Sequence, residues 1–463
     1  MQYLSTRGEA AEIGFEDAML AGLAPDGGLY LPRQWPQISL AEFKALRGRP
    51  YPEIAEAVIS RYSADAIPPE RLRAMLNEAY AQFRHPAVAP LKQLDSNLFL
   101  LELFHGPTLA FKDVAMQILA RMMEFALEKR NIHATIIGAT SGDTGSAAIE
   151  AFKSSKRASI FILHPHGRVS EVQRRQMTTV DSPSVHNIAL EGSFDDCQAI
   201  IKTLFGDAGF RDRLRLSGVN SINWARIVAQ IVYYVSSALS LGAPDRAVSF
   251  CVPTGNFGDI FAGYAAKRMG LPIDRLIIAT NINDILDRTL RTGRYDIHKV
   301  LPTTSPSMDI QVSSNFERLL FEASGRNGGK VRGMMASLAQ SGSFTLDGEI
   351  LAAIRSEFDS GHADEATVAR TIATTLDATG ELLDPHSAIG VALAGRSKPD
   401  RGPLISLATA HPAKFPDAVE QACGIRPALP ARLAYLMSAR EKFSILPNDP
   451  EAVKSFILAR SVS

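Results

Sequence analysis

Lys112 lies in an apolar segment that could make its amine a nucleophile. The segment reads FHGPTLAFKD over residues 104–113, and Lys112 falls at the expected start of a helix. Burial and the positive end of a helix both disfavour an ammonium ion, so both lower the pKa of this amine. A neutral amine can form a Schiff base with a carbonyl group. Most lysines at helix ends simply extend into solvent, and from this segment alone that alternative stays open.

Two glycine-rich turns have the composition of anion-binding sites. One reads GATSGDTG at 138–145 and the other PTGNFGD at 253–259, and each lies between an apolar run and an expected helix. Backbone N–H groups at a helix N-terminus bind anions, and glycine lets a ligand approach the backbone closely. Neither turn is a P-loop or a GxGxxG fingerprint. Taken singly, each is also compatible with a plain tight turn.

Other catalytic and metal-binding patterns are weak in this chain. His164 and His166 have no further ligand at zinc spacing, so we expect both to be surface residues and predict no metal site. The HExxH and GxSxG motifs are absent. The three cysteines at 197, 251 and 423 are far apart, which excludes a CxxC site and favours a reducing compartment.

Composition limits the class of protein further. The 463 residues include 49 Lys plus Arg and 49 Asp plus Glu, a balance that argues against a nucleic-acid partner. No apolar run is long enough for a membrane span, and the first residues do not resemble a secretory signal. We therefore expect a cytoplasmic protein that does not associate with membranes.

The elements that must position the lysine and the two turns alternate along the chain. Strands are expected at 97–104, 134–138, 159–163, 184–190, 247–252, 275–280 and 404–408. Helices are expected between them, including a long one at 224–241. Alternation of this kind predicts parallel sheets with helices on both faces. The end of the chain, from about 425, is expected to be helical or irregular.

A lysine at a helix start and two anion-binding turns together form the set that a pyridoxal phosphate enzyme requires. With these features, the chain resembles the threonine synthase family of fold-type-II (tryptophan synthase β-like) pyridoxal phosphate enzymes. The resemblance covers nearly the whole chain. The motifs that carry it are YLSTRG (3–8), FHGPTLAFKD (104–113), GATSGDTG (138–145), NSINWARIVAQ (220–230), PTGNFGD (253–259), SMDIQVSSNFERL (307–319) and TAHPAKF (409–415).

The resemblance implies an α/β fold of fold type II. It implies two doubly wound α/β domains with an additional N-terminal unit and a C-terminal tail. The N-terminal unit is expected at 1–90, the large cofactor-binding domain at 91–131 and 245–425, the small domain at 132–244, and the tail at 426–463.

The resemblance also implies how pyridoxal 5′-phosphate is held. Lys112 matches the lysine that forms the Schiff base, and Thr409 matches the hydroxyl residue that faces the pyridine nitrogen. The residues that match the phosphate-binding turn are Gly255, Asn256, Phe257 and Gly258. Asp143 stands where relatives of this fold have an asparagine that bonds the cofactor's O3′, so that contact must differ here.

The substrate implied is O-phospho-L-homoserine, which carries both a carboxylate and a phosphate. The residues expected to bind the carboxylate and the cofactor face are Thr140, Ser141, Gly142 and Thr144. Those that could receive the phosphate are Asn220, Ser221, Asn223 and Arg226. For this second group, a helix cap followed by an exposed arginine is the open alternative.

The activity implied is that of a lyase in threonine biosynthesis, acting at the last step. It would convert O-phospho-L-homoserine and water into L-threonine and phosphate by γ-elimination and then β-addition of water. The alternatives are a serine/threonine dehydratase and a catalytically silent homologue, but the latter would be expected to have lost Lys112. The expected assembly is a monomer or a homodimer.

Overall fold

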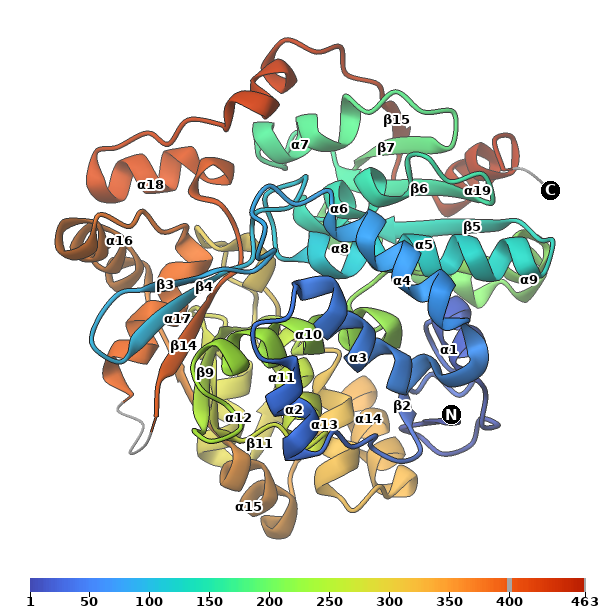
Figure 1. Ribbon diagram of the computed structural model, residues 1–463. Helices are drawn as coiled ribbons and strands as arrows, with labels where there is room; N and C mark the ends of the chain where they lie inside the picture. Colours follow the sequence, from blue (N-terminus) through green and yellow to red (C-terminus); the bar gives the residue numbers. More distant parts are fainter. Residues whose placement is uncertain (398–401, 462–463) are drawn as a thin grey trace.

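The protein folds around two open β-sheets with helices packed on them (Figure 1). The computed structural model describes residues 1–397 and 402–461. All seven strands expected from the sequence occur, with ends that differ by a few residues. Alternation of apolar strands and helices therefore predicted the α/β class correctly.

The larger sheet has six strands in the order β13-β10-β9-β14-β4-β3, and only β3 runs antiparallel to its neighbour. These strands are β3 (Leu91–Gln93), β4 (Leu98–Glu102), β9 (Val248–Pro253), β10 (Ile273–Thr280), β13 (Phe358–His362) and β14 (Leu404–Ala408). They all lie inside the two ranges that the sequence analysis proposed for the large domain.

The smaller sheet has five parallel strands in the order β15-β7-β6-β5-β8. These strands are β5 (Ala134–Ala139), β6 (Ala158–Pro165), β7 (Val185–Glu191), β8 (Leu216–Ser217) and β15 (Ser444–Pro447). Four come from the range proposed for the small domain. The fifth, β15, corrects the expectation of a helical or irregular tail, because it extends this sheet beside β7.

Side chains alternate between the two faces of the smaller sheet, as a two-residue repeat requires. Ile136 and Ile160 join the main apolar core, whereas Ile137 and Phe161 join a second core on the opposite face. Both faces are thus buried, which explains why β5 and β6 are mostly apolar.

Helices fill the space around and between the sheets. In the first half they are α1 (Phe15–Ala21), α2 (Leu40–Leu46), α3 (Tyr51–Ser63), α4 (Pro69–Tyr80), α5 (Lys112–Lys129), α6 (Asp143–Phe152), α7 (Glu171–Thr178), α8 (Phe194–Gly206), α9 (Ala208–Leu214) and α10 (Trp224–Ser240). In the second half they are α11 (Gly258–Arg268), α12 (Ile285–Thr292), α13 (Phe316–Ala323), α14 (Gly328–Ser341), α15 (Gly348–Glu357), α16 (Glu365–Thr379), α17 (Pro385–Arg396), α18 (Pro416–Cys423) and α19 (Pro450–Leu458).

Helix α10 is the central packing element of the molecule. Nearly all of its residues are buried, and it packs against α3, α5 and α11 (Figure 1). Its N-terminal Trp224 lies 6.3 Å, centroid to centroid, from Tyr3 of the antiparallel pair β1 (Tyr3–Ser5) and β2 (Tyr30–Pro32). The N-terminal segment therefore shares one apolar core with the helices that surround the sheets.

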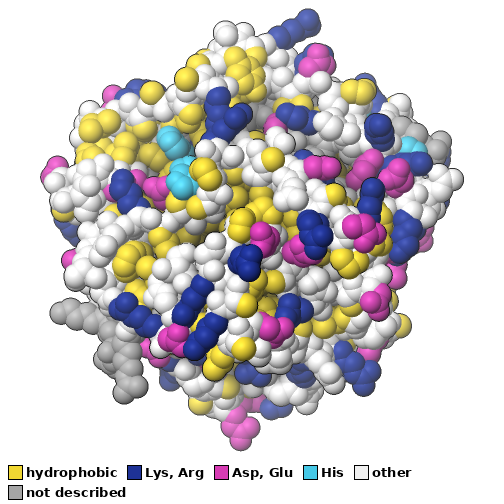
Figure 2. Space-filling view, viewed as in Figure 1, with side chains coloured by type: hydrophobic (Ala, Val, Ile, Leu, Met, Phe, Trp, Pro, Cys, Tyr) yellow, Lys and Arg dark blue, Asp and Glu magenta, His cyan; other side chains and the backbone are white. Residues whose placement is uncertain are grey.

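Charged side chains of both signs are interspersed over the face shown in Figure 2, in keeping with the zero net charge. None of the described helices has the length and apolar character of a membrane span.

Candidate active site

A cavity of about 1220 Å³ opens where strands of both sheets end. Thr140 follows β5, Thr254 follows β9 and Thr409 follows β14, and all three line it. In open α/β sheets, ligands bind outside the carboxyl ends of the strands. The topology therefore brings three of the segments singled out in the sequence to one place.

Three helix N-termini meet at this cavity: those of α5, α6 and α11. The N-cap residues Phe111, Gly142 and Phe257 do not cap these helices with their own side chains. In α6, Thr140 Oγ1 accepts from the third N–H group, that of Gly145, at 2.9 Å. Phe257 has a left-handed backbone, with φ 64°, which turns the chain sharply into α11. Uncapped N–H groups at the positive ends of helices suit anionic ligands.

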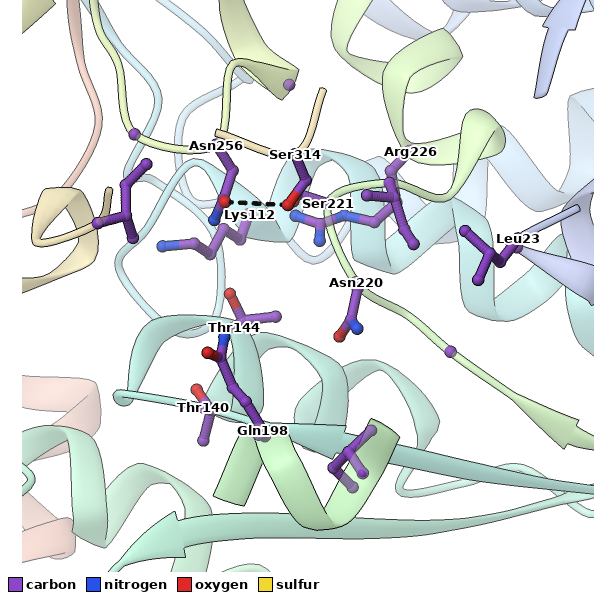
Figure 3. A pocket seen from close by; sticks show the side chains of 18 of the residues that line it. Leu23, Lys112, Thr140, Thr144, Gln198, Asn220, Ser221, Arg226, Asn256 and Ser314 are labelled. Atoms are coloured by element: carbon purple, nitrogen blue, oxygen red, sulfur yellow. Dashed lines mark hydrogen bonds between the residues drawn. The ribbon is translucent and has the colours of Figure 1, made fainter. Parts of the chain in front are cut away.

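Lys112 begins α5 and extends into the cavity (Figure 3). The residue is 8% exposed, and its Nζ lies 3.3 Å from Oδ2 of Asp143. Burial lowers the pKa of this amine; the carboxylate of Asp143 opposes that effect, while Lys414 and Arg226 reinforce it. The depressed pKa favours the neutral amine that attacks a carbonyl group.

Asp143 is the centre of a buried polar network. Its carboxylate accepts from Gln173 Nε2 at 2.8 Å and from Ser307 Oγ at 3.3 Å, and it also contacts two lysines. Burial alone would raise the pKa of this carboxyl group, but Lys414 and Lys112 outweigh burial and hold the pKa well below its usual value. Asp143 is therefore ionised in the folded protein.

Arg226 is a buried cation that forms no ion pair with any acidic side chain of the described chain. The residue is 2% exposed, and its Nη1 donates to the carbonyl oxygen of Val219 at 3.0 Å. Its Nε has no hydrogen-bond partner in the described chain, and burial lowers its pKa to about 10. Figure 3 shows the side chain beside Ser221 and Asn220 at the cavity wall. A buried charge is costly unless it is paired, so this guanidinium indicates a place for an anion.

The cavity brings together most of the residues expected from the sequence. Those that line it are Lys112, Thr140, Ser141, Asp143, Thr144, Asn220, Ser221, Arg226, Gly255, Asn256, Phe257, Gly258 and Thr409. For Arg226, burial argues against the alternative of an exposed arginine next to a helix cap.

Asn223 and Gly142 lie outside the cavity wall, contrary to expectation. Asn223 caps α10 through Ala225, and its amide donates to the carbonyl oxygen of Met19 at 2.8 Å. Gly142 packs against Gln173, and its N–H donates to Thr140 Oγ1, which shapes the turn. Asparagine and glycine in these motifs thus serve local backbone geometry.

Several residues of the network were not among the expected site residues. They are Gln173 and Gln176 on α7, Ser307 in the loop before α13, His386 on α17, and Lys414 after β14. Ser307 lies in the motif SMDIQVSSNFERL and Lys414 in the motif TAHPAKF, both of which carried the resemblance. Membership of these motifs was the signal in the sequence that could have identified these two residues. His164, expected at the surface, is instead buried within β6, and His166 is exposed.

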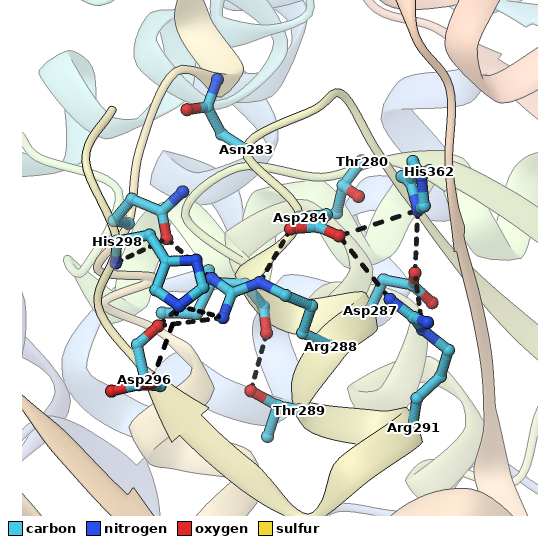
Figure 4. A network of polar contacts seen from close by, with 12 residues as sticks. Thr280, Asn283, Asp284, Asp287, Arg288, Thr289, Arg291, Asp296, His298 and His362 are labelled. Atoms are coloured by element: carbon cyan, nitrogen blue, oxygen red, sulfur yellow. Dashed lines mark hydrogen bonds and ion pairs between the residues drawn. The ribbon is translucent and has the colours of Figure 1, made fainter. Parts of the chain in front are cut away.

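A second cluster, formed by Asp284, Asp287 and His362, has the spacing of metal ligands (Figure 4). Two arginines already balance its charge: Arg288 Nε lies 2.8 Å from Asp284, and Arg291 Nε lies 3.1 Å from Asp287. His362 Nδ1 lies 3.0 Å from Asp287. These contacts connect α12 with β13, and we assign the cluster to the structure of the fold.

The residues at the cavity fit pyridoxal phosphate. The near-buried lysine suits the aldehyde of the cofactor, and the N-terminus of α11, where the N-cap residue Phe257 provides no side-chain cap, suits its phosphate. A side chain at Gly255 would place its Cβ 2.9 Å from the carbonyl oxygen of Ser307, so the turn requires glycine.

Three family models match consecutive parts of the chain. The model described as threonine synthase N terminus matches residues 2–80, the one for pyridoxal-phosphate dependent enzymes matches 83–339, and the one for the threonine synthase C-terminal region matches 387–457.

Curated and solved relatives agree with these models. A threonine synthase from Pseudomonas aeruginosa is 52% identical, over 99% of this chain and 98% of that protein. The crystal structure of PLP-bound threonine synthase from Brucella melitensis is 59% identical, has a TM-score of 0.98 and covers 100% of both chains. The yeast threonine synthase structure is 40% identical, with a TM-score of 0.94, over 99% of this chain and 98% of that one. Motifs, site geometry and full-length similarity together show that this chain belongs to the threonine synthase family.

Proposed function

We propose that this chain converts O-phospho-L-homoserine and water into L-threonine and phosphate, the last step of threonine biosynthesis. The observation that carries the proposal is the unpaired, buried Arg226 in the same cavity as Lys112. Cofactor and substrate each carry a phosphate, and the substrate also carries a carboxylate. Three helix N-termini and a guanidinium that has no ion-pair partner among the described residues supply enough separate anion sites for all of them.

Lys112 would hold pyridoxal phosphate through Nζ, and the turn from Gly255 to Gly258 would bind its phosphate at the N-terminus of α11. Thr409 would face the ring nitrogen. When bound, the cofactor supplies the electron sink that stabilises negative charge on carbon atoms of the substrate.

Protons are moved by the chain itself. The reaction removes protons from Cα and Cβ of the substrate and returns protons to carbon, which one flexible amine can do. Lys112 Nζ is on a four-carbon stem, and burial lowers its pKa, so it is suited to both directions of transfer.

The substrate would lie between the turn at 140–144 and the segment at 220–226. Ser141 and Thr144 stand next to the N-terminus of α6, where a carboxylate is stabilised. Arg226, with Asn220 and Ser221, would receive the phosphate.

The direct test is an assay of the pure protein with O-phospho-L-homoserine in which phosphate and L-threonine are followed together. Equal amounts of both products support the proposal. Release of ammonia from L-serine or L-threonine, without turnover of the phosphate ester, would identify a dehydratase instead.

We also propose a cytoplasmic location and a monomeric or homodimeric state. The three cysteines are free, in keeping with a reducing compartment. Light scattering coupled to size-exclusion chromatography measures the mass of the assembly and tests the proposed monomeric or homodimeric state directly.

Substitution of Gly255 is expected to weaken cofactor binding. In Gly255→Ala the new Cβ would lie 2.9 Å from Ser307 O and 3.3 Å from Met308 Cα, and both neighbours are backbone atoms. Overpacking of this kind costs about 1–3 kcal/mol, so we expect the Kd for pyridoxal phosphate to rise about tenfold. Fluorescence titration of cofactor-free protein measures that constant.

Gly333→Ala on α14 is the matched control, because a Cβ there meets open space. Its Kd should equal that of the parent, and thermal unfolding of the cofactor-free proteins separates binding from stability. A Gly255→Ala protein that binds the cofactor as tightly as the parent would refute the assignment of this turn.

A further inference from the structure

A second lysine lies in the same network as Lys112. Lys414 ends a short 3₁₀ turn after β14 and is 0% exposed. Its Nζ lies 2.9 Å from Asp143 Oδ1 and donates to Thr108 O at 2.7 Å and to Gln176 Oε1 at 3.0 Å. Three acceptors match the three N–H donors of an ammonium group, so the side chain is held in one position.

Two lysines therefore share one carboxylate. Lys414 contacts Oδ1 of Asp143 at 2.9 Å, and Lys112 contacts Oδ2 at the longer distance of 3.3 Å. A buried lysine paired alone with a carboxylate is stabilised as the cation. Here, a second and closer cation already balances the charge of Asp143.

We propose that Lys414 is a positioning residue that neutralises Asp143 and so leaves Lys112 available as a neutral amine. The proposal rests on the proposed role of Lys112 as the residue that binds the cofactor. It also accounts for an aspartate at 143, because an asparagine there could not balance the charge of Lys414.

The other charged groups near this pair are engaged elsewhere or carry positive charge. Asp113, on α5, accepts from Thr108 through both carboxylate oxygens, and Asp259, on α11, accepts from Tyr233 and Tyr234.

The remaining neighbours are Arg226 on α10 and His386 on α17, whose Nδ1 lies 2.7 Å from Asp384. In the described chain, Asp143 is thus the one carboxylate that forms an ion pair with Lys112 or Lys414. The direction of the Lys112 pKa agrees: after burial, Asp143 raises it and Lys414 lowers it.

Lys414 also connects parts of the two sheets. It follows β14 of the larger sheet, while Asp143 and Gln176 belong to α6 and α7, beside the smaller sheet. Thr108 lies in the loop that leads into α5 and Lys112. The contacts of Lys414 therefore both balance the charge of Asp143 and hold the loop that positions the amine of Lys112.

The test uses the cofactor-free full chain and measures the reactivity of Lys112 with cyanate across a pH series. Cyanate modifies the neutral amine, and peptide mapping isolates the signal of Lys112. The pH at which the reactivity of Lys112 is half-maximal is the midpoint of this series. In Lys414→Met, Asp143 faces Lys112 alone, so the midpoint should move to higher pH, and modification of Lys112 at neutral pH should slow about tenfold. Asp143→Asn should move the midpoint to lower pH.

The double variant Asp143→Asn with Lys414→Met removes both opposing charges and should return the midpoint toward that of the parent. Lys414→Arg keeps the charge and should leave the midpoint in place. Lys330→Met, which removes an exposed lysine paired with Asp347, is the matched control and should also leave it unchanged. An unshifted midpoint in folded Lys414→Met overturns the proposal. If that variant does not fold, an unshifted midpoint in Asp143→Asn overturns it.

Failure of this inference is distinguishable from failure of the proposed function. Borohydride reduction of the parent protein with bound pyridoxal phosphate identifies the lysine that carries the cofactor. A label on a lysine other than 112 refutes the proposed function, whereas the cyanate midpoints test the Asp143–Lys414 pair without any cofactor.

Discussion

Lys112→Ala is expected to lower kcat/KM for O-phospho-L-homoserine by about 10⁴-fold and to abolish covalent attachment of the cofactor. The loss is large because one amine both bonds pyridoxal phosphate and moves protons between substrate carbons, and functions that share one residue fail together. The turn at Gly255 and the N-terminus of α11 remain, so the cofactor should still bind without a covalent bond. Borohydride reduction, peptide mapping and the phosphate-release assay measure these effects.

Lys129→Ala is the matched control for this variant, since Lys129 ends the same helix α5 and its exposed amine pairs with Glu16. It should keep full activity and leave the borohydride label on Lys112. Appreciable turnover by Lys112→Ala, or a reducible bond to another lysine in that protein, would contradict the assignment.

The interior strands could be predicted from the sequence because both of their faces are buried. β5, β6 and β9 are mostly apolar and almost fully buried, and each is followed by a turn or loop. β13 and β15 were missed since they are edge strands that mix apolar and exposed residues. Pairing in these two strands depends on a neighbour distant in sequence, and local composition does not reveal it.

The site could be predicted to the extent that its residues lie in contiguous motifs. The sequence predicted the helix starts at Lys112 and after the turn at 255–258, and both segments line the cavity. The Asp143–Lys414 ion pair could not be predicted from the sequence, because it forms only when the fold brings the segment after β14 next to α6. Asn223 was expected at the site but lies outside the cavity wall and caps α10, because an asparagine before a helix can cap it as readily as bind a ligand.

Arg226→Met is expected to reduce kcat/KM for O-phospho-L-homoserine at least about thirtyfold, while the absorption band of bound pyridoxal phosphate persists. Loss of one partner of a charge-assisted contact in a dry pocket costs about 2–5 kcal/mol. Arg226 forms no salt bridge within the described chain, so its removal leaves no carboxylate without an ion-pair partner and the protein should fold. Steady-state kinetics and the absorption spectrum provide the two measurements.

The selectivity of the loss decides whether Arg226 binds the substrate phosphate. L-homoserine lacks the phosphate, so its binding, followed by the change in the cofactor spectrum, should differ little between Arg226→Met and the parent. Arg213 is an exposed arginine, and the control variant Arg213→Met should bind both ligands as the parent does. Arg226 is buried beside Asn220 and Ser221 at the cavity wall, and a ligand with an anionic group at that position would form an ion pair with its guanidinium. Equal losses for both ligands would instead show that Arg226 supports the cofactor or the fold, and the substrate phosphate would then have to bind elsewhere in the cavity.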